Sequence, residues 1–276
     1  MKQTAPIKKT VIMHFHNEEY MLPWWLEHHL KFFDHGVLIN HGSTDASADI
    51  CRELVPHWEL VDSELSEFSA VETDLEVMRY EVASQGWKMA LNATEFLVCT
   101  PELLDKKLQL MNSKNQKCLQ TRGVVMVDIA PDQKPAKEIP LIEQKHHGYL
   151  EQDHPVFTQP YANLRKLMWY LRWDRRARKG GRHRIMHCYA HGHYTTGRHA
   201  TSHRIDARPS DIFTFWYGFS PWNGDMLARK LQFKSRIPQA DREQRLGFQH
   251  LFDEGELNEN YRLCCSKSRD LSGLLP

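Results

Sequence analysis

The sequence predicts an α/β protein, and three observations lead to this fold class. Short apolar runs rich in β-formers alternate with segments whose apolar residues recur at helical spacing, which is typical of parallel sheets with covered faces. The chain has 276 residues, 41% of them hydrophobic and 26% charged, which is enough for a sizeable core. We therefore expect a Rossmann-type, mostly parallel sheet with helices on both faces.

The first hundred residues carry this alternation most clearly. The predicted elements are, in order, a strand over 10–16, a helix over 17–33, a strand over 37–40, a helix over 45–54, a strand over 58–61, a helix over 70–85 and a strand over 87–98. Ser43 or Asp45 is well placed to cap the second helix, Pro56 ends it, and Gly86 ends the third helix.

The alternation weakens beyond residue 100, where we expect a helical and loop-rich extension. Its predicted parts are a long strand over 118–129, a loop-rich excursion over 131–160, a buried helix or aromatic surface segment over 164–173, and helices over 223–233 and 241–252. The expected division is a binding core over 1–130 and an acceptor-side extension over 131–276, packed on the same domain.

The charge of the chain is unevenly distributed. Residues 1–100 hold 7 Lys and Arg against 16 Asp and Glu, a net charge of −9, and the remainder holds 29 against 19, a net charge of +10. Nucleic acid, anionic lipid or a phosphate-bearing small molecule would each suit the basic part. The six cysteines show no CxxC pairing and are expected to be reduced.

No stretch has the apolar length needed to span a bilayer, and the first residues lack the pattern of a secretory signal. We therefore expect a cytoplasmic protein. The basic part could bring it to a membrane surface as a peripheral protein.

Three loops follow predicted strands and are expected to meet at the carboxyl edge of the sheet, where ligands bind in such folds. They read "HNEE" over 16–19, "NHGSTD" over 40–45 and "NATE" over 92–95. Gly42 permits a tight turn and a close approach, and the helix that follows it offers free N–H groups. Taken alone, "GSTD" is equally well explained as a capped turn.

In this order, "HNEE", "NHGSTDAS", "RYEVASQGW" and "LNATEFLV" resemble the family 2 glycosyltransferases of the GT-A fold. The likeness is to members with N-E-x, then D-N-G-S-T-D-x-S, then D-x-D-E-F-L, and it covers residues 8–100. It implies a nucleotide-sugar donor and transfer of the sugar to an acceptor hydroxyl, with inversion in most members. The expected pathway is glycan or surface-polysaccharide synthesis, with a glycan or lipid-linked acceptor.

The resemblance also implies site residues. The nucleotide would contact Asn17, Glu18, Asn40, His41, Asp45 and Arg79. The diphosphate would contact Asn92, Thr94, and His191 or His193. The second half of the chain matches the family only loosely, through "HGHY" over 191–194 and "GRH" over 197–199. Glu95 would be the surviving acid of the site, and Asp153 is the choice for the base that inverting transfer requires.

The chain departs from the family where the D-x-D motif would hold a metal ion. Asn92-Ala93-Thr94 replaces it, so two carboxylates are neutral, and only Glu95 keeps its charge. This leaves no certain cofactor and at most a weakly bound Mn²⁺ or Mg²⁺. An inactive descendant that binds nucleotide sugar or glycan as a partner or regulator is the alternative.

A basic stretch offers another way to neutralise a diphosphate. "RWDRRARKGGRHR" over 172–184 contains seven Lys or Arg residues, and Arg182 is its candidate diphosphate ligand because arginine matches phosphate geometry. A solvated basic surface is an equal alternative. Nucleic acid is not expected as a partner, because no recognisable nucleic-acid module is present.

The histidines and the aromatic residues of the second half could each form a further binding site. A zinc site from the pairs His183/His187 and His199/His203 is disfavoured, since the glycines and threonines between them argue against one continuous helix. The aromatic stretch over 211–223 could stack a sugar or form a membrane-facing lip. Packing on the sheet is the favoured interpretation.

Overall fold

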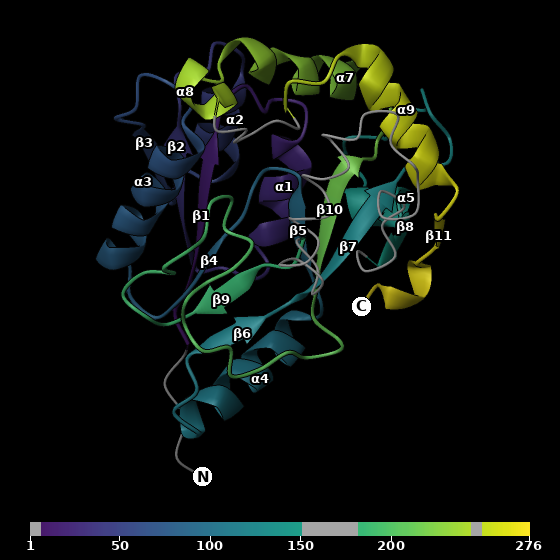
Figure 1. Ribbon diagram of the computed structural model, residues 1–276. Helices are drawn as coiled ribbons and strands as arrows, with labels where there is room; N and C mark the ends of the chain where they lie inside the picture. The colour runs from purple at the N-terminus through teal and green to yellow at the C-terminus, as the bar shows by residue number, and fades with distance from the viewer. Residues whose placement is uncertain (1–6, 151–181, 244–249) are drawn as a thin grey trace.

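The computed structural model describes residues 7–150, 182–243 and 250–276, which form two mixed β-sheets with helices around them (Figure 1). The first sheet has six strands in the order β3-β2-β1-β4-β9-β6, and the second has five in the order β11-β8-β7-β10-β5. The α/β class is confirmed, whereas the expected single, mostly parallel sheet is wrong.

The first sheet carries the parallel part of the fold. Its strands are β1 (Lys9–Phe15), β2 (His35–Asn40), β3 (Glu59–Asp62), β4 (Trp87–Ala90), β9 (Ile185–His187) and β6 (Cys118–Gln120). The four strands β3, β2, β1 and β4 run parallel, and β9 is antiparallel to both β4 and β6. All seven residues of β1 are buried, which explains why its sequence shows no polar alternation.

The three helices predicted in the first hundred residues are confirmed. They are α1 (Leu22–His29), α2 (Ser47–Leu54) and α3 (Ala70–Ala83), and they follow β1, β2 and β3 in turn. Pro23 lies in the first turn of α1, where its missing N–H leaves no intrahelical bond unmade. The helix buries Trp25 and Leu26 completely.

The second sheet takes strands from all parts of the chain. They are β5 (Glu95–Val98), β7 (Arg122–Val127), β8 (His147–Leu150), β10 (Phe213–Phe219) and β11 (Arg269–Asp270). Two predicted strands, over 87–98 and 118–129, are each divided between the two sheets. Both halves of each run are buried, so their apolar pattern gives no sign of the break.

Most of the remaining helices lie around the second sheet or beyond the upper end of β1 in Figure 1, and the first of them along the chain lies below β6. They are α4 (Pro101–Ser113), α5 (Leu141–Gln144), α7 (Gly224–Leu231), α8 (Gln239–Glu243), α9 (Glu254–Cys265) and the 3₁₀ helices η3 (Gln232–Ser235) and η5 (Ser272–Leu274). The helix over 223–233 is confirmed as α7 followed by η3, and α9 was not predicted. The segment over 164–173 lies outside the described residues.

The aromatic stretch over 211–223 contributes to the core, as favoured. It forms β10, in which Phe215 and Tyr217 are wholly buried. All six cysteines are free. Within the described ranges, no helix has the length and apolar character that a membrane crossing requires. The division of the chain at residue 130 stays a prediction.

Candidate functional site

The loops after β1 and β2 are bonded to each other at the carboxyl edge of the first sheet. The Asn17 N–H donates to Ser43 Oγ (3.0 Å), and the Thr44 N–H donates to Asn17 Oδ1 (2.8 Å). The Glu18 N–H donates to Ser47 Oγ (2.7 Å). Asn17 has a φ of +49°, which asparagine tolerates better than most residues. The two loops therefore form one unit.

Two backbone N–H groups at the start of α2 already have acceptors within the protein. The Ala46 N–H donates to Glu19 Oε2 (3.0 Å), and the Ser47 N–H donates to Asp45 Oδ1 (3.0 Å). Carboxylates are favoured at a helix start because they accept from its unpaired donors and complement its dipole. Two of the N–H groups at this end of the helix are therefore engaged by the protein itself.

Gly42 serves the turn. Its φ is +63°, and a Cβ built on it would meet no atom within 4 Å. The glycine is therefore explained by its left-handed backbone, without a close approach of another part of the protein.

Glu18 and Asn17 are joined to the C-terminal part of the chain. Glu18 is 4% exposed, and its carboxylate accepts from Nε and Nη2 of Arg229 on α7. Gln232 Nε2 donates to the Asn17 carbonyl (3.0 Å). Both Glu18 oxygens are thus engaged in holding α7 over the loop.

Asn40 and His41 close the loop after β2. Asn40 Nδ2 donates to Asp62 Oδ1 (3.1 Å), and Asn40 Oδ1 accepts from the Ser43 N–H (3.0 Å). The His41 ring lies over Phe68, with 6.2 Å between centroids and 27° between planes. His41 Nε2 is 3.0 Å from the Leu65 carbonyl, while buried Nδ1 has no partner among the described residues.

The free nitrogen of His41 is an acceptor, because the ring is neutral. Burial, then the charge of Arg236, lowers the pKa of His41, so the neutral ring is favoured. Because Nε2 donates to a carbonyl, Nδ1 carries the lone pair. His41 thus combines a stacked ring with an unused acceptor.

Two arginines that the sequence did not single out stand beside these loops. Arg198 is 5% exposed, is paired with Asp74, and donates from Nη2 to Asn92 Oδ1 (2.6 Å). Arg236 donates from Nη2 to the His41 carbonyl (3.2 Å). Arg198 Nε and Arg236 Nη1 are buried and have no hydrogen-bond partner within the described part of the chain.

His14, on β1, lies close enough to His41, Arg198 and Arg236 for their charges to affect its pKa. Burial, followed by the charges of His41, Arg198 and Arg236 in that order, lowers its pKa from 6.5 to about 3. The neutral ring can donate from Nε2 to Glu76 Oε2, 3.1 Å away. We call His14, His41, Asn92, Arg198 and Arg236 the rim site.

Glu95 lies in a different environment. It is wholly buried, and its two oxygens accept from Nε and Nη2 of Arg184. Glu95 Oε2 also accepts from the Asn92 N–H (2.8 Å). Thr94, 5% exposed, accepts at its carbonyl from the Tyr217 N–H (2.8 Å). Glu95 is therefore part of a buried ion pair.

The residues at the D-x-D position do not fit a Mn²⁺ or Mg²⁺ ion. These ions take several oxygens, usually including carboxylates. Asn92 and Thr94 are neutral, the Asn92 oxygen accepts from Arg198, and the Glu95 oxygens accept from Arg184. The guanidinium of Arg198, rather than a set of carboxylates, adjoins this position.

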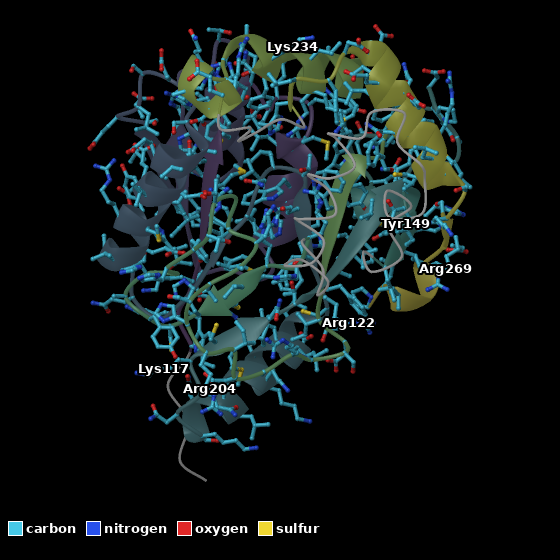
Figure 2. The ribbon with its side chains drawn as sticks, viewed as in Figure 1. Lys117, Arg122, Tyr149, Arg204, Lys234 and Arg269 are labelled. Atoms are coloured by element: carbon cyan, nitrogen blue, oxygen red, sulfur yellow. The ribbon has the colours of Figure 1, made fainter. Side chains whose placement is uncertain are left out.

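The structure does not bring His191 and His193 to the rim site. Because β9 is antiparallel to β4, the chain that leaves β9 emerges at the amino end of β4. There the Gly192 N–H donates to Glu81 Oε2 (2.6 Å). Figure 2 shows Arg204, which follows this loop in the chain, at the end of the molecule opposite Lys234.

The other candidates also have defined places. Arg79 is half-exposed and pairs with Glu64 (2.6 Å) and Glu76 (3.6 Å). The Arg182 guanidinium lies 3.6 Å from the centre of the Trp216 ring. Asp153 lies outside the described residues, as does the basic stretch up to residue 181.

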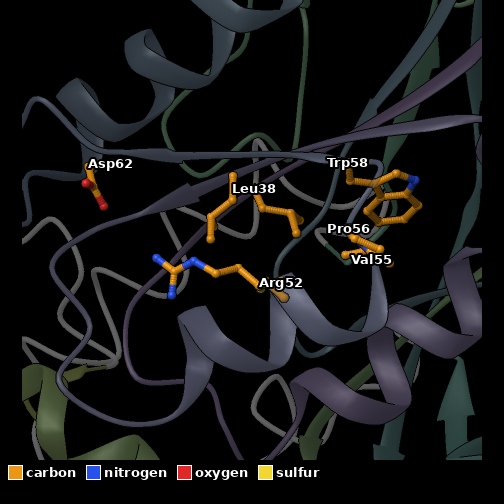
Figure 3. Close-up of a pocket in the computed structure, with 8 residues that line it drawn as sticks. Leu38, Arg52, Val55, Pro56, Trp58 and Asp62 are labelled. Atoms are coloured by element: carbon orange, nitrogen blue, oxygen red, sulfur yellow. The ribbon is translucent and has the colours of Figure 1, made fainter.

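A pocket of about 350 Å³ lies elsewhere, between α2 and the strands β2 and β3 (Figure 3). Its lining includes Leu38, Arg52, Val55, Pro56, Trp58 and Asp62. None of the residues predicted for the site lines it, so it is not the candidate site.

No protein-family model matches this chain, and no curated protein matches it. Solved structures with similar folds include S. aureus TarS, which is 15% identical with a TM-score of 0.35, the match covering 49% of this chain and 26% of TarS. A structure of S. aureus TarS 1-349 with UDP-GlcNAc is 14% identical with a TM-score of 0.37, covering 48% of this chain and 40% of that one.

Another similar structure is glucosyl-3-phosphoglycerate synthase from Mycobacterium tuberculosis with Mn²⁺, UDP and glucosyl-3-phosphoglycerate. It is 11% identical with a TM-score of 0.36, and the match covers 66% of this chain and 57% of that one. The matched part of the chain thus spans 26% to 57% of these three proteins. Each likeness covers only part of both chains, at 11% to 15% identity.

Proposed function

We propose that the chain binds a nucleotide sugar at the rim site and transfers its sugar to an acceptor hydroxyl without a divalent ion. One observation carries the proposal: Arg198 Nε, Arg236 Nη1 and His41 Nδ1 are buried without a partner among the described residues. Buried polar atoms are nearly always paired. A ligand that accepts from two arginines and donates to an imidazole would satisfy all three.

A diphosphate suits the two arginines. Guanidinium groups remain charged and match phosphate oxygens geometrically. When the bond to the sugar breaks, negative charge develops on the departing diphosphate and must be stabilised by groups already in place. Arg198 is held in place by Asp74 and Asn92, so it could supply this charge where the family pattern would hold a metal ion.

The nucleoside would then lie over the loops after β1 and β2. The stacked pair of His41 and Phe68 offers a flat surface, and His41 Nδ1 can accept from a base N–H or a ribose hydroxyl. In this proposal Asn17 and Asn40 are direct ligands, and Asp45 and Glu18 hold the loops in shape through the bonds described above.

The acceptor would bind on the side of residues 131–276. For inverting transfer a carboxylate must accept the proton of the acceptor hydroxyl, and Asp153 remains our proposal for this base. Arg182 remains our proposal for a further diphosphate contact. The expected acceptor is a glycan or a lipid-linked glycan, the latter at a membrane surface.

The test is a panel of nucleoside diphosphate sugars, with thermal unfolding to report binding and release of nucleoside diphosphate to report turnover. We expect one class of nucleotide sugar to stabilise the protein, and turnover with an acceptor glycan to persist in EDTA. Turnover that is abolished by EDTA and restored by Mn²⁺ would contradict the metal-free mechanism. Failure of every nucleotide sugar to bind would contradict the whole proposal.

A binding protein without catalytic activity is the second candidate. It is favoured by the complete burial of Glu95 in its pair with Arg184, since the last acid of the motif is then not free to act. Stabilisation by a nucleotide sugar, without turnover in EDTA or in Mn²⁺, would select this candidate over the enzyme.

A further inference from the structure

Three potential metal ligands meet at the edge of the second sheet, where β8 pairs with β11. Asp270 is the direct antiparallel partner of His147, and His146 precedes β8. One ligand atom from each of the three residues lies within 4.8 Å of the others, with both histidines half-buried and Asp270 exposed. Figure 1 shows β8 and β11 at the right edge, on the far side from β1 to β4.

The hydrogen bonds of His146 define its tautomer. His146 Nδ1 is 3.0 Å from the carbonyl of Glu143, which can only accept, so Nδ1 carries a hydrogen. In the neutral ring Nε2 then holds the lone pair. Metal-binding histidines commonly have their other ring nitrogen bonded to a carbonyl in this way.

The lone pair on Nε2 would face the carboxylate of Asp270. His146 Nε2 lies 3.6 Å from Asp270 Oδ1, so a neutral imidazole would set a lone pair against a carboxylate. A cation between the two atoms removes the repulsion. A metal ion bound to both residues would be such a cation.

Other contacts hold the three side chains in one place. The rings of His146 and His147 are stacked with 5.0 Å between centroids and 28° between planes. Asp270 Oδ1 accepts from the Ser272 N–H (2.8 Å), and the Leu271 N–H donates to the His146 carbonyl (3.0 Å). The ligands are thus supported by backbone contacts on both strands, which lowers the cost of ordering them when an ion binds.

We propose that His146, His147 and Asp270 bind a divalent transition metal ion. Two imidazoles and one carboxylate form a ligand set that zinc accepts, with a fourth position open to water. The ion would tie β11, near the end of the printed sequence, to the edge of β8. This site lies in the second sheet and is independent of the nucleotide-sugar proposal.

The test uses the full chain, freed of metal, in titrations with Zn²⁺ and with Co²⁺ at neutral pH. We expect one high-affinity equivalent and a visible Co²⁺ absorption spectrum. His146→Gln and Asp270→Asn should each weaken this binding by about tenfold or more. Asparagine keeps an oxygen for the Ser272 N–H, so Asp270→Asn should leave the fold intact.

His35→Gln is the matched control. His35 Nε2 lies 3.9 Å from Glu59 Oε2 in an exposed pair, and neither residue belongs to the three-ligand group. Its replacement should leave the Zn²⁺ affinity unchanged. Zn²⁺ should also raise the thermal unfolding temperature of the wild type and of His35→Gln, and should raise it less in Asp270→Asn.

Two results would overturn the proposal. If the wild type binds no Zn²⁺, the three residues do not form a metal site. If Zn²⁺ binds equally well to the wild type, His146→Gln and Asp270→Asn, the ion is held by other histidines of the chain.

Discussion

The rim site and the Glu95–Arg184 pair both contain arginines with buried nitrogen atoms, but they differ in how completely these atoms are hydrogen-bonded. Arg184 donates from Nε, Nη1 and Nη2 to protein acceptors, and Glu95 accepts at both oxygens. Arg198 and Arg236 each keep a buried nitrogen without a partner among the described residues. We infer that complete pairing marks an arginine that supports the fold, and incomplete pairing marks one that binds a ligand.

The position of the complete pair fits a structural role. Glu95 is the first residue of β5 in the second sheet, and Arg184 directly precedes β9 in the first sheet. The pair therefore joins the two sheets. A buried pair of this kind contributes less than its charges suggest, but removing one partner leaves the other charge uncompensated.

Glu95→Gln gives the largest expected effect on this comparison. We expect the free energy of unfolding to fall by about 3–5 kcal/mol, because Arg184 would remain buried with its charge. Urea denaturation of both proteins would measure the change. The double variant Glu95→Gln/Arg184→Met should recover part of the loss. A loss below about 1 kcal/mol in the single variant would show that Glu95 does not support the fold.

Buried His28 makes a prediction about how the stability of the protein depends on pH. It lies on α1 and is buried against β5, with Nε2 2.7 Å from the Leu97 carbonyl, and burial lowers its pKa from 6.5 to about 4. The unfolded state therefore binds more protons than the folded state between these values, so stability falls as the pH drops from 6.5 to 4. At about 1.4 kcal/mol for each pKa unit, the expected loss is about 3 kcal/mol.

His28→Gln separates this effect from that of other buried histidines, such as neighbouring His29. Glutamine keeps a donor for the Leu97 carbonyl but cannot titrate. The unfolding free energy of the wild type, followed against pH by urea denaturation, should fall more steeply than that of the variant. Parallel curves would mean that His28 keeps its ordinary pKa in the folded protein.

Arg236→Gln tests the rim site, whose arginines are incompletely hydrogen-bonded. Arg236 makes one backbone bond, to His41, so stability should change by less than about 1 kcal/mol. Affinity for a nucleoside diphosphate should fall by roughly 10- to 100-fold, since a hydrogen bond to a charged group contributes about 1.5–3 kcal/mol. Calorimetric titration would measure the affinity. Exposed Arg52, paired with Asp49, provides the control variant Arg52→Gln, which should bind as the wild type does.

Local patterns in the sequence predicted the first part of the fold well. The helices α1, α2 and α3 follow from apolar spacing and from the stops at Pro56 and Gly86, and these signals act over a few residues. The breaks inside 87–98 and 118–129 could not be found in this way. Both sides of each break are apolar because the two sheets bury them. Which sheet each half joins depends on strands that come much later in the chain.

The partners of the site residues were missed for the same reason. Glu95 and Arg184 are 89 positions apart, and Glu18 and Arg229 are 211 apart. The single local signal was "GRH" over 197–199, which contains Arg198 and matches the family loosely. His191 and His193 were favoured because they share a short motif with that family. The antiparallel direction of β9, which carries them to the other end of β4, has no signature in the sequence.

Gly42→Ala gives the smallest expected effect and separates the shape of the rim from its charge. A residue with a Cβ at φ +63° costs about 1 kcal/mol of stability, although the added atom would meet nothing within 4 Å. Gly224→Ala is the control, because its Cβ also lies in open space but its φ is not in the left-handed region. Urea denaturation should show the loss in the first variant alone. If Gly42→Ala also weakened nucleotide binding as much as Arg236→Gln, the loop conformation, rather than the unpaired arginines, would be what recognises the ligand.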